Sequence, residues 1–163
     1  MPFLRRRPVP PAVKALGLPP AERRVAWALT AAGEPVVATD AALVLPGDVR
    51  LEWYRVERAG WQRPHLTVLE VAGVEGAGER HELELTDEGD LPEVVRTRVT
   101  ASVAWSSHSR LSPRGAVRVV GRRRPGREVL EWQLVYDPST DLGDPLVRAQ
   151  AEELLEGARR SIG

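Results

Sequence analysis

A cluster of arginines in the last third of the chain is the strongest candidate for a functional site in this sequence. Its members are Arg118, Arg122, Arg123, Arg124 and Arg127. They belong to a stretch, residues 95–127, that holds nine arginines and no carboxylate. Guanidinium groups bind anionic groups through charge-assisted, often bidentate, hydrogen bonds. We therefore predict that these five arginines form a recognition surface for a protein or peptide partner.

Nucleic acid is the alternative ligand of the same cluster. A basic hairpin tip can track a phosphate backbone, and Trp105 and Trp132 would be available to stack on bases. Against this, the chain has a formal net charge of zero at pH 7, whereas dedicated nucleic-acid-binding domains are basic. Glu128, Glu131 and the acidic block at residues 34–94 can also neutralise the cluster within the chain. All but one of the 23 basic residues are arginine, which is typical of GC-rich codon usage and accounts for part of the clustering.

The residue types that usually perform catalysis or bind metals are scattered. His65, His81 and His108 lie in separate segments without metal-ligand spacing, so no metal site is predicted. The chain has no cysteine, which excludes thiol catalysis, disulfides and thiolate zinc sites. The segment Ser106–Ser109 contains serine beside histidine but no nucleophile elbow, and we interpret it as a polar linker. We expect no enzyme and no cofactor, and a small hydrolase is the least favoured function.

A glycine-rich segment, Gly73–Gly78, superficially resembles a phosphate-binding loop. It carries Glu75, lacks the Lys-Ser/Thr pair, and leads into a strand pattern rather than a helix. We interpret it as a hairpin loop. The basic tripeptide Arg5–Arg7 has the same two interpretations as the arginine cluster, a contact surface or a solvated segment.

Short apolar segments separated by turn residues run through the first half of the chain. In one of them, Leu83 and Leu85 alternate with the carboxylates of Glu82 and Glu84, so one face is apolar. Seven such segments at close spacing predict an antiparallel sandwich or small barrel. The predicted strands are Val25–Thr30, Pro35–Thr39, Ala42–Leu45, Val49–Trp53, Glu57–Gln62, Leu66–Val71 and His81–Leu85.

The apolar period then changes to that of a helix. Leu91, Val95 and Val99 share one stripe of a predicted helix of about four turns, which we expect the carboxylate of Asp90 to cap. A second amphipathic helix is predicted after Asp144, near the end of the chain.

Between these helices the sequence predicts a hairpin with Pro125-Gly126 as a two-residue turn. In this register Val119 faces Trp132 and Val117 faces Leu134, which gives the hairpin one apolar face. A hairpin with one helix is too small to be stable alone. We therefore expect it to pack on the preceding strands or on a second copy of the chain.

Seven strands followed by one amphipathic helix is the element order of a pleckstrin-homology-like (PH-like) barrel. The segments Val37–Leu45, Leu51–Ala59 and Leu66–Val68 resemble bacterial PH-like and GRAM-like domains. The resemblance covers about residues 22–105 and extends to small proteins of GC-rich bacteria that carry this barrel with an added tail. It implies a helix-closed barrel that binds an extended peptide beside an exposed strand. Phosphoinositide-binding members hold the headgroup with cations near the first hairpin loop, and Ala31–Glu34 has none, so no headgroup ligand is expected.

The chain is thus predicted to be an α+β protein with three regions. Residues 1–21 form a Pro/Arg-rich N-terminal arm, residues 22–105 the PH-like barrel with its closing helix, and residues 106–163 the hairpin and C-terminal helix extension. No apolar run approaches the roughly 20 residues of a membrane span, and no signal-peptide core follows the basic N-terminus, so a cytoplasmic location is expected. The expected function is that of a non-catalytic binding or assembly module, compatible with a homodimer, that uses the arginine cluster and one exposed barrel edge.

Overall fold

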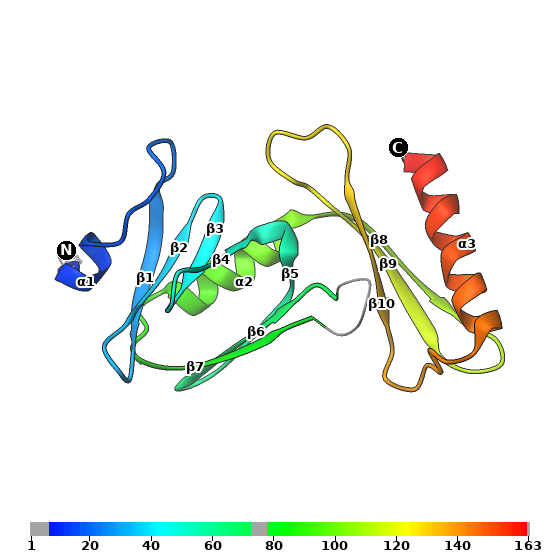
Figure 1. The fold of residues 1–163 in the computed structure, drawn as a ribbon, viewed down its shortest axis with the longest axis horizontal. Helices are drawn as coiled ribbons and strands as arrows, with labels where there is room; N and C mark the ends of the chain where they lie inside the picture. Colours follow the sequence, from blue (N-terminus) through cyan, green and yellow to red (C-terminus); the bar gives the residue numbers. More distant parts are fainter. Residues whose placement is uncertain (1–6, 73–77, 163) are drawn as a thin grey trace, which may run out of the picture.

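The computed structural model describes residues 7–72 and 78–162. These residues form a seven-stranded sheet, a three-stranded sheet and three α-helices along one elongated molecule (Figure 1). The first described residues and the C-terminal helix lie at its opposite ends. The predicted α+β class is confirmed.

All seven predicted strands are present, and they pair with antiparallel neighbours in the order β4-β3-β2-β1-β7-β6-β5. The sheet is a meander in which β1 also pairs with β7. Its two edges, β4 and β5, do not pair with each other, so the prediction of a closed barrel is wrong. A 3-10 turn, η1 (Trp53–Arg55), separates these edge strands and redirects the chain between them. The strands are β1 (Arg24–Thr30), β2 (Pro35–Thr39), β3 (Ala42–Leu45), β4 (Val49–Glu52), β5 (Val56–Gln62), β6 (His65–Glu70) and β7 (Arg80–Asp87).

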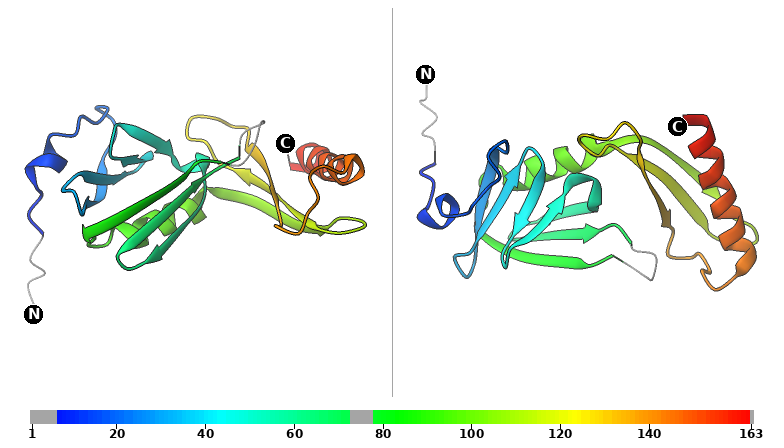
Figure 2. Two further views of the ribbon diagram at one scale, coloured as in Figure 1. Left: turned by 60° about the horizontal axis from the view of Figure 1, so that its bottom comes forward. Right: turned by 45° about the horizontal axis from the view of Figure 1, so that its top comes forward.

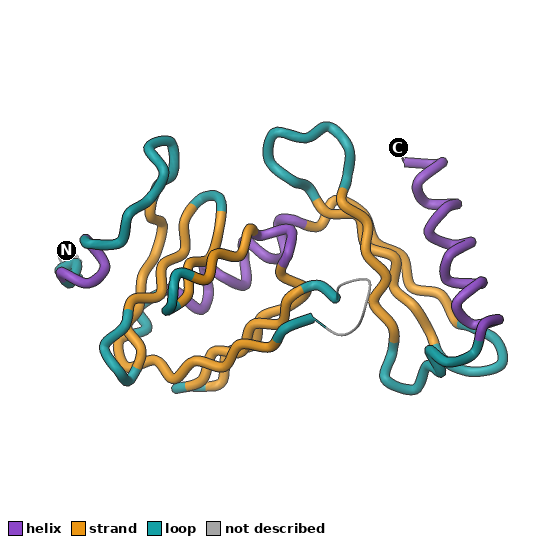
Figure 3. The backbone as a smooth tube through the Cα atoms, viewed as in Figure 1, coloured by secondary structure: helices purple, strands orange, loops and turns teal. Residues whose placement is uncertain are grey.

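Helix α2 (Leu91–Ser102) packs against the inner face of this folded sheet (Figure 3). Leu91, Val95 and Val99 are buried in one core with side chains from every strand of the sheet, which confirms the predicted stripe. The predicted cap is not formed, because the Asp90 side chain makes no capping hydrogen bond.

The described part of the predicted N-terminal arm packs on the outer face of the sheet through Val9, Val13, Leu16 and Leu18. Helix α1 (Pro11–Lys14) places Val13 against Trp27 and Val37, and Val13 is 1% exposed. Since successive strand residues point to opposite faces, the neighbours of Trp27 in β1 lie in the inner core. The guanidinium carbon of Arg7 lies 3.7 Å from the centroid of the Trp27 ring. Burial on both faces explains why the first three strands are almost continuously apolar.

The C-terminal extension forms a second sheet with a core of its own. Its strands are β8 (Val103–Arg110), β9 (Ala116–Arg122) and β10 (Glu131–Tyr136), in the order β10-β9-β8. Helix α3 (Pro145–Ile162) packs on one face of this sheet (Figure 2). The small core consists of two clusters, Leu111, Val117, Val147 and Ala151 in one and Val119, Leu155 and Ala158 in the other.

Strand β8 corrects the interpretation of Ser106–Ser109 as a polar linker. These residues pair with β9 from Ser106↔Val120 to Ser109↔Val117. The strand begins directly after α2, at Val103, whereas the predicted boundary of the extension follows residue 105.

The predicted hairpin is formed, but in a register offset by two residues. Leu134 pairs with Val119, and the ladder starts at Glu131 and Arg122. The Pro-Gly turn itself is present, because the Arg127 amide donates to the Arg124 carbonyl at 3.0 Å. An offset of two keeps each side chain on its predicted face.

Helix α3 begins as predicted. The Asp144 carboxylate accepts a hydrogen bond from the Leu146 amide at 2.9 Å. Within the part of the chain that the structure describes, no helix combines the length and the apolar character that crossing a membrane requires.

Candidate binding site at the junction of the two sheets

An extra residue in β5 interrupts the β5–β6 ladder where the two sheets meet. Val56 pairs with Glu70 and Arg58 pairs with Leu69, so Glu57 has no partner in the β5–β6 ladder. The extra residue of a β-bulge leaves the ladder and bends its strand. The carbonyl oxygen of Glu57 is therefore available to a donor from outside the sheet.

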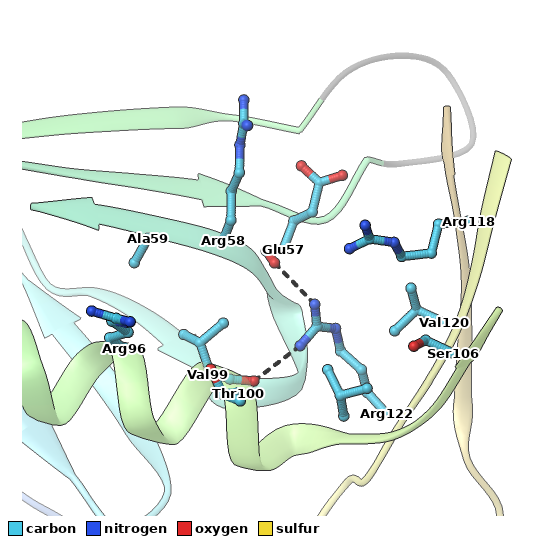
Figure 4. Close-up of a pocket in the computed structure, with 11 residues that line it drawn as sticks. Glu57, Arg58, Ala59, Arg96, Val99, Thr100, Ser106, Arg118, Val120 and Arg122 are labelled. Atoms are coloured by element: carbon cyan, nitrogen blue, oxygen red, sulfur yellow. Dashed lines mark hydrogen bonds between the residues drawn. The ribbon is translucent and has the colours of Figure 1, made fainter. Parts of the chain in front are cut away.

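Arg122 of β9 supplies that donor and is itself buried, with 3% of its surface exposed. Its Nη2 donates to the Glu57 carbonyl at 2.9 Å. Its Nη1 donates to the Val99 carbonyl at 3.2 Å, and Figure 4 shows this bond and the one to Glu57. Nη1 also donates to Ser102 Oγ at 2.7 Å, and Nε donates to Gln133 Oε1 at 3.0 Å. Each guanidinium nitrogen thus has an acceptor, which is the condition for keeping a cation in the interior.

The surroundings of Arg122 also act on its charge. Burial lowers the pKa of the Arg122 guanidinium from its ordinary value because the charged form loses hydration, and the Glu57 carboxylate opposes this shift. Gln133, the acceptor on β10, donates through Nε2 to the Tyr54 carbonyl at 2.9 Å. We call Arg122, Gln133 and Ser102 the junction network, because they join β9 and β10 to η1, β5 and α2.

A cavity of about 310 Å³, the junction pocket, lies beside this network, between β5, α2, β8 and β9. Its apolar lining consists of Ala59, Val99, Val103 and Val120. Three exposed arginines, each from a different element, are among the residues that line it: Arg58 on β5, Arg96 on α2 and Arg118 on β9 (Figure 4). We call these three residues the arginine rim.

The arginine rim makes the junction pocket electropositive. Glu57 is the one carboxylate among the described residues that line it. None of the three rim arginines forms an ion pair with another residue of the described chain. Thr100 and Ser106 add hydroxyl groups to the wall. An anion that enters the pocket therefore meets several donors without having to displace an internal carboxylate from the rim.

The structure separates the five arginines of the predicted recognition surface. Arg118 belongs to the rim of the junction pocket. Arg122 also lines the pocket, but it is buried and its guanidinium nitrogens all donate within the chain, so a common exposed surface of all five residues is not formed. The Arg123 guanidinium donates to the Ala101 and Val103 carbonyls, both at 3.3 Å, where α2 ends.

The remaining two predicted residues line a second groove at the β9–β10 loop. Arg124 pairs with Glu131 at 3.4 Å, and its guanidinium carbon lies 5.0 Å from the centroid of the Tyr54 ring. Arg127 is exposed in the same loop. Four arginines line this groove, Arg98, Arg123, Arg124 and Arg127, and among the described residues Arg124 is the one of them that forms an ion pair.

Sequence reasoning missed two of the three rim arginines. Arg96 lies in the stretch without carboxylates, and that stretch was the available signal for it. Arg58 lies in the acidic block and carries no local signal. It is brought to Arg118 by the meeting of two sheets, which no short-range pattern encodes.

The other residues considered as functional candidates in the sequence either pack or pair within the protein or lie outside the described residues. Trp105 and Trp132 contact each other edge to face, with ring centroids 5.7 Å apart, and pack against the small core under α3. His108 lies 3.7 Å from Asp137 at the surface. Arg5, Arg6 and residues 73–77 of the glycine-rich segment lie outside the described residues.

Comparisons with protein-family models, with curated proteins and with solved structures find no match to this chain.

Proposed function

We propose that this protein is a non-catalytic binding module that recognises an anionic segment of a partner protein at the junction pocket. The arginine rim carries this proposal. Arg58, Arg96 and Arg118 come from three elements, line one apolar cavity and form no ion pair within the described chain. The hydrogen-bonded junction network beside them fixes β9 against β5 and α2 and so supports a preorganised site.

The neighbouring strand favours an extended peptide as the occupant. β5 contributes Glu57, Arg58 and Ala59 to the pocket and is also an edge of the seven-stranded sheet. A peptide that lies along an edge strand gains main-chain hydrogen bonds, while its side chains enter adjacent pockets. An acidic side chain at that place would lie among the rim arginines.

Nucleic acid is supported less well by the same charges. A phosphate backbone is best matched by a continuous basic stripe. The described arginines are instead divided between the rim, the buried network and the β9–β10 loop, where Arg124 pairs with Glu131. Nucleic-acid binding remains a prediction, which the experiment below distinguishes from the proposal.

We also propose that the seven-stranded sheet and α2 are a PH-like unit. The meander order, the β1–β7 pairing and the helix that follows the seventh strand support this relation. The β1–β2 loop, Ala31–Glu34, has no basic residue. The site proposed here is accordingly at the junction with the extension and not at that loop.

The test is capture of partners by the tagged full chain from lysate, with and without nuclease, followed by binding of the captured protein in purified form. Replacing Arg58, Arg96 and Arg118 together by alanine should abolish capture, because each charge-assisted hydrogen bond contributes about 1.5–3 kcal/mol. A matched variant lacks three exposed arginines outside the pocket lining, Arg24, Arg114 and Arg148, and should bind like the wild type.

Equal capture by both triple variants would overturn the proposal. Capture that disappears with nuclease, and an affinity that falls steeply with salt for an oligonucleotide, would support nucleic-acid binding instead. Thermal melts of both variants establish that the fold is retained.

A further inference from the structure

Three side chains with metal-binding atoms meet at the end of the β6–β7 hairpin. They are Glu70 at the end of β6, Glu79 just before β7, and His81 in β7. Their candidate ligand atoms all lie within 4.8 Å of one another. None of the three lines the junction pocket, so this cluster is independent of the proposed function.

The pairing of the two strands brings the cluster together. The Glu70 amide donates to the Glu79 carbonyl at 2.9 Å, and Val68 pairs with His81. Since side chains two residues apart share a face, Glu70, Glu79 and His81 lie on the same face of the hairpin as Val68, which is fully buried in the inner core. The cluster therefore lies at the margin of the inner core and not on the outer surface of the sheet.

A glycine holds the backbone close at this point. A Cβ atom at Gly78 would overlap the carbonyl group of Glu70 and approach Val71 to 2.9 Å. Only glycine allows the segment before Glu79 to lie directly over the end of β6. The two glutamates are consequently held opposite each other.

The charges of the cluster are not balanced by the rest of the described chain. His81 Nε2 lies 2.9 Å from Glu70 Oε2, and each of these side chains is 14% exposed. Glu79 adds a second carboxylate, and no arginine or lysine of the described residues forms an ion pair with either glutamate. The nearest arginine in sequence, Arg80, pairs with Glu82 at 2.9 Å.

We propose that Glu70, Glu79 and His81 form a binding site for a divalent transition-metal ion, with Zn²⁺ as the best match. An imidazole with two carboxylates is a donor set that Zn²⁺ accepts, whereas Mg²⁺ and Ca²⁺ prefer oxygen ligands alone. Tetrahedral bonds of about 2.1 Å place ligand atoms roughly 3.4 Å apart. To bind the ion, His81 Nε2 and Glu70 Oε2 must move slightly apart from their present 2.9 Å, and the Glu79 carboxylate must move closer to both. Rotation of the side chains is sufficient for both movements. Water would complete the coordination.

This site was not predictable from ligand spacing in the sequence. Glu70 and Glu79 are nine positions apart in the sequence, and His81 has no second histidine at metal-ligand spacing. The ion would connect the end of β6 to the start of β7 and so stabilise the hairpin against separation of its strands.

The test is titration of the chelator-treated full chain with Zn²⁺ by calorimetry, and with Co²⁺ by visible absorption, which reports tetrahedral coordination. We expect one ion per chain and a rise in melting temperature with Zn²⁺. Replacing His81 by alanine should weaken binding more than about 100-fold, since even changes that only orient a ligand cost 10–100-fold. Glu79→Gln should weaken it at least about tenfold. Because Glu79 is exposed, this variant retains the fold.

Two exposed histidines provide matched controls. His65 lies at the other end of β6, and His108 lies in β8, so His65→Ala and His108→Ala should bind Zn²⁺ like the wild type. The proposal is overturned if the wild type binds no Zn²⁺. It is also overturned if Glu79→Gln and His81→Ala retain full affinity, because the ion would then occupy another site.

Discussion

Arg122 shows how one side chain can be essential to the structure while resembling a surface cation in the sequence. Replacing it with alanine would remove the donors to the Glu57 and Val99 carbonyls and to Gln133, and would leave a cavity in the junction. Each buried polar group without a partner costs about 1–3 kcal/mol. We therefore expect Arg122→Ala to lower the free energy of unfolding by at least about 3 kcal/mol, measured by urea denaturation.

The control for this prediction is a second arginine of the same strand. Arg118 is exposed and lines the junction pocket, so Arg118→Ala should change the free energy of unfolding by less than about 0.5 kcal/mol. Equal losses from the two variants would show that the junction network does not stabilise the fold. The pair separates the structural arginine of β9 from the one proposed to bind a ligand.

The two long helices, α2 and α3, differ in the capping of their first turns, and this difference predicts unequal effects of removing the two aspartates. Asp144 accepts a hydrogen bond from the Leu146 amide at 2.9 Å, whereas the Asp90 side chain makes no capping hydrogen bond to α2. Asp144→Ala should destabilise the protein by about 1 kcal/mol, and Asp90→Ala by less, since only its interaction with the helix dipole is lost. Urea denaturation of both variants measures the difference, and a larger loss from Asp90→Ala would contradict it.

The same elements show which features a sequence encodes locally. The seven strands and the stripes of α2 and α3 follow from apolar periods and turn residues, and their bounds were predictable to within a residue or two. Strand β8 was not predictable, because Ser106–Ser109 is polar on both faces and becomes a strand through pairing with β9. Alternation of apolar and polar residues also cannot distinguish two hairpin registers that differ by two residues, because both place the same side chains on the same face. The β9–β10 pairing differs from the predicted register by two residues.

The candidate site depends on contacts that the sequence does not contain in any short window. The alternation in β9 places Arg118 and Arg122 on one face, as the predicted hairpin requires. Whether that face is solvated or covered is decided by the bulge at Glu57, which comes from the other sheet. Contacts between the two sheets therefore decide which arginines are buried, and Arg122, which the sequence predicted at the surface, is buried.

At the scale of the whole molecule, two cores of unequal size are joined by the junction network. The seven-stranded sheet and α2 enclose fifteen buried apolar side chains in one cluster, whereas the extension buries seven in two smaller ones. A small core cannot stabilise three strands and a helix as well as a large one. We expect native-state hydrogen exchange to be faster in β8–β10 and α3 than in β1–β3.

Gln133→Ala tests whether the junction network couples the two cores. This variant loses the hydrogen bond that Gln133 accepts from Arg122 and the one that it donates to the Tyr54 carbonyl. Amide hydrogen exchange should therefore accelerate in β10 and, across the junction, in η1 and the start of β5. The amides of β1–β3 should stay protected. Gln150 is the matched control, because its side-chain hydrogen bonds to described residues all lie within the extension, with the main chain of Ser112 at 2.9 and 2.7 Å and with the Leu146 carbonyl. Gln150→Ala should therefore accelerate exchange near Ser112 without reaching η1. Uniform acceleration of every element by Gln133→Ala would mean that the molecule opens as one cooperative unit and that the two cores are not separable.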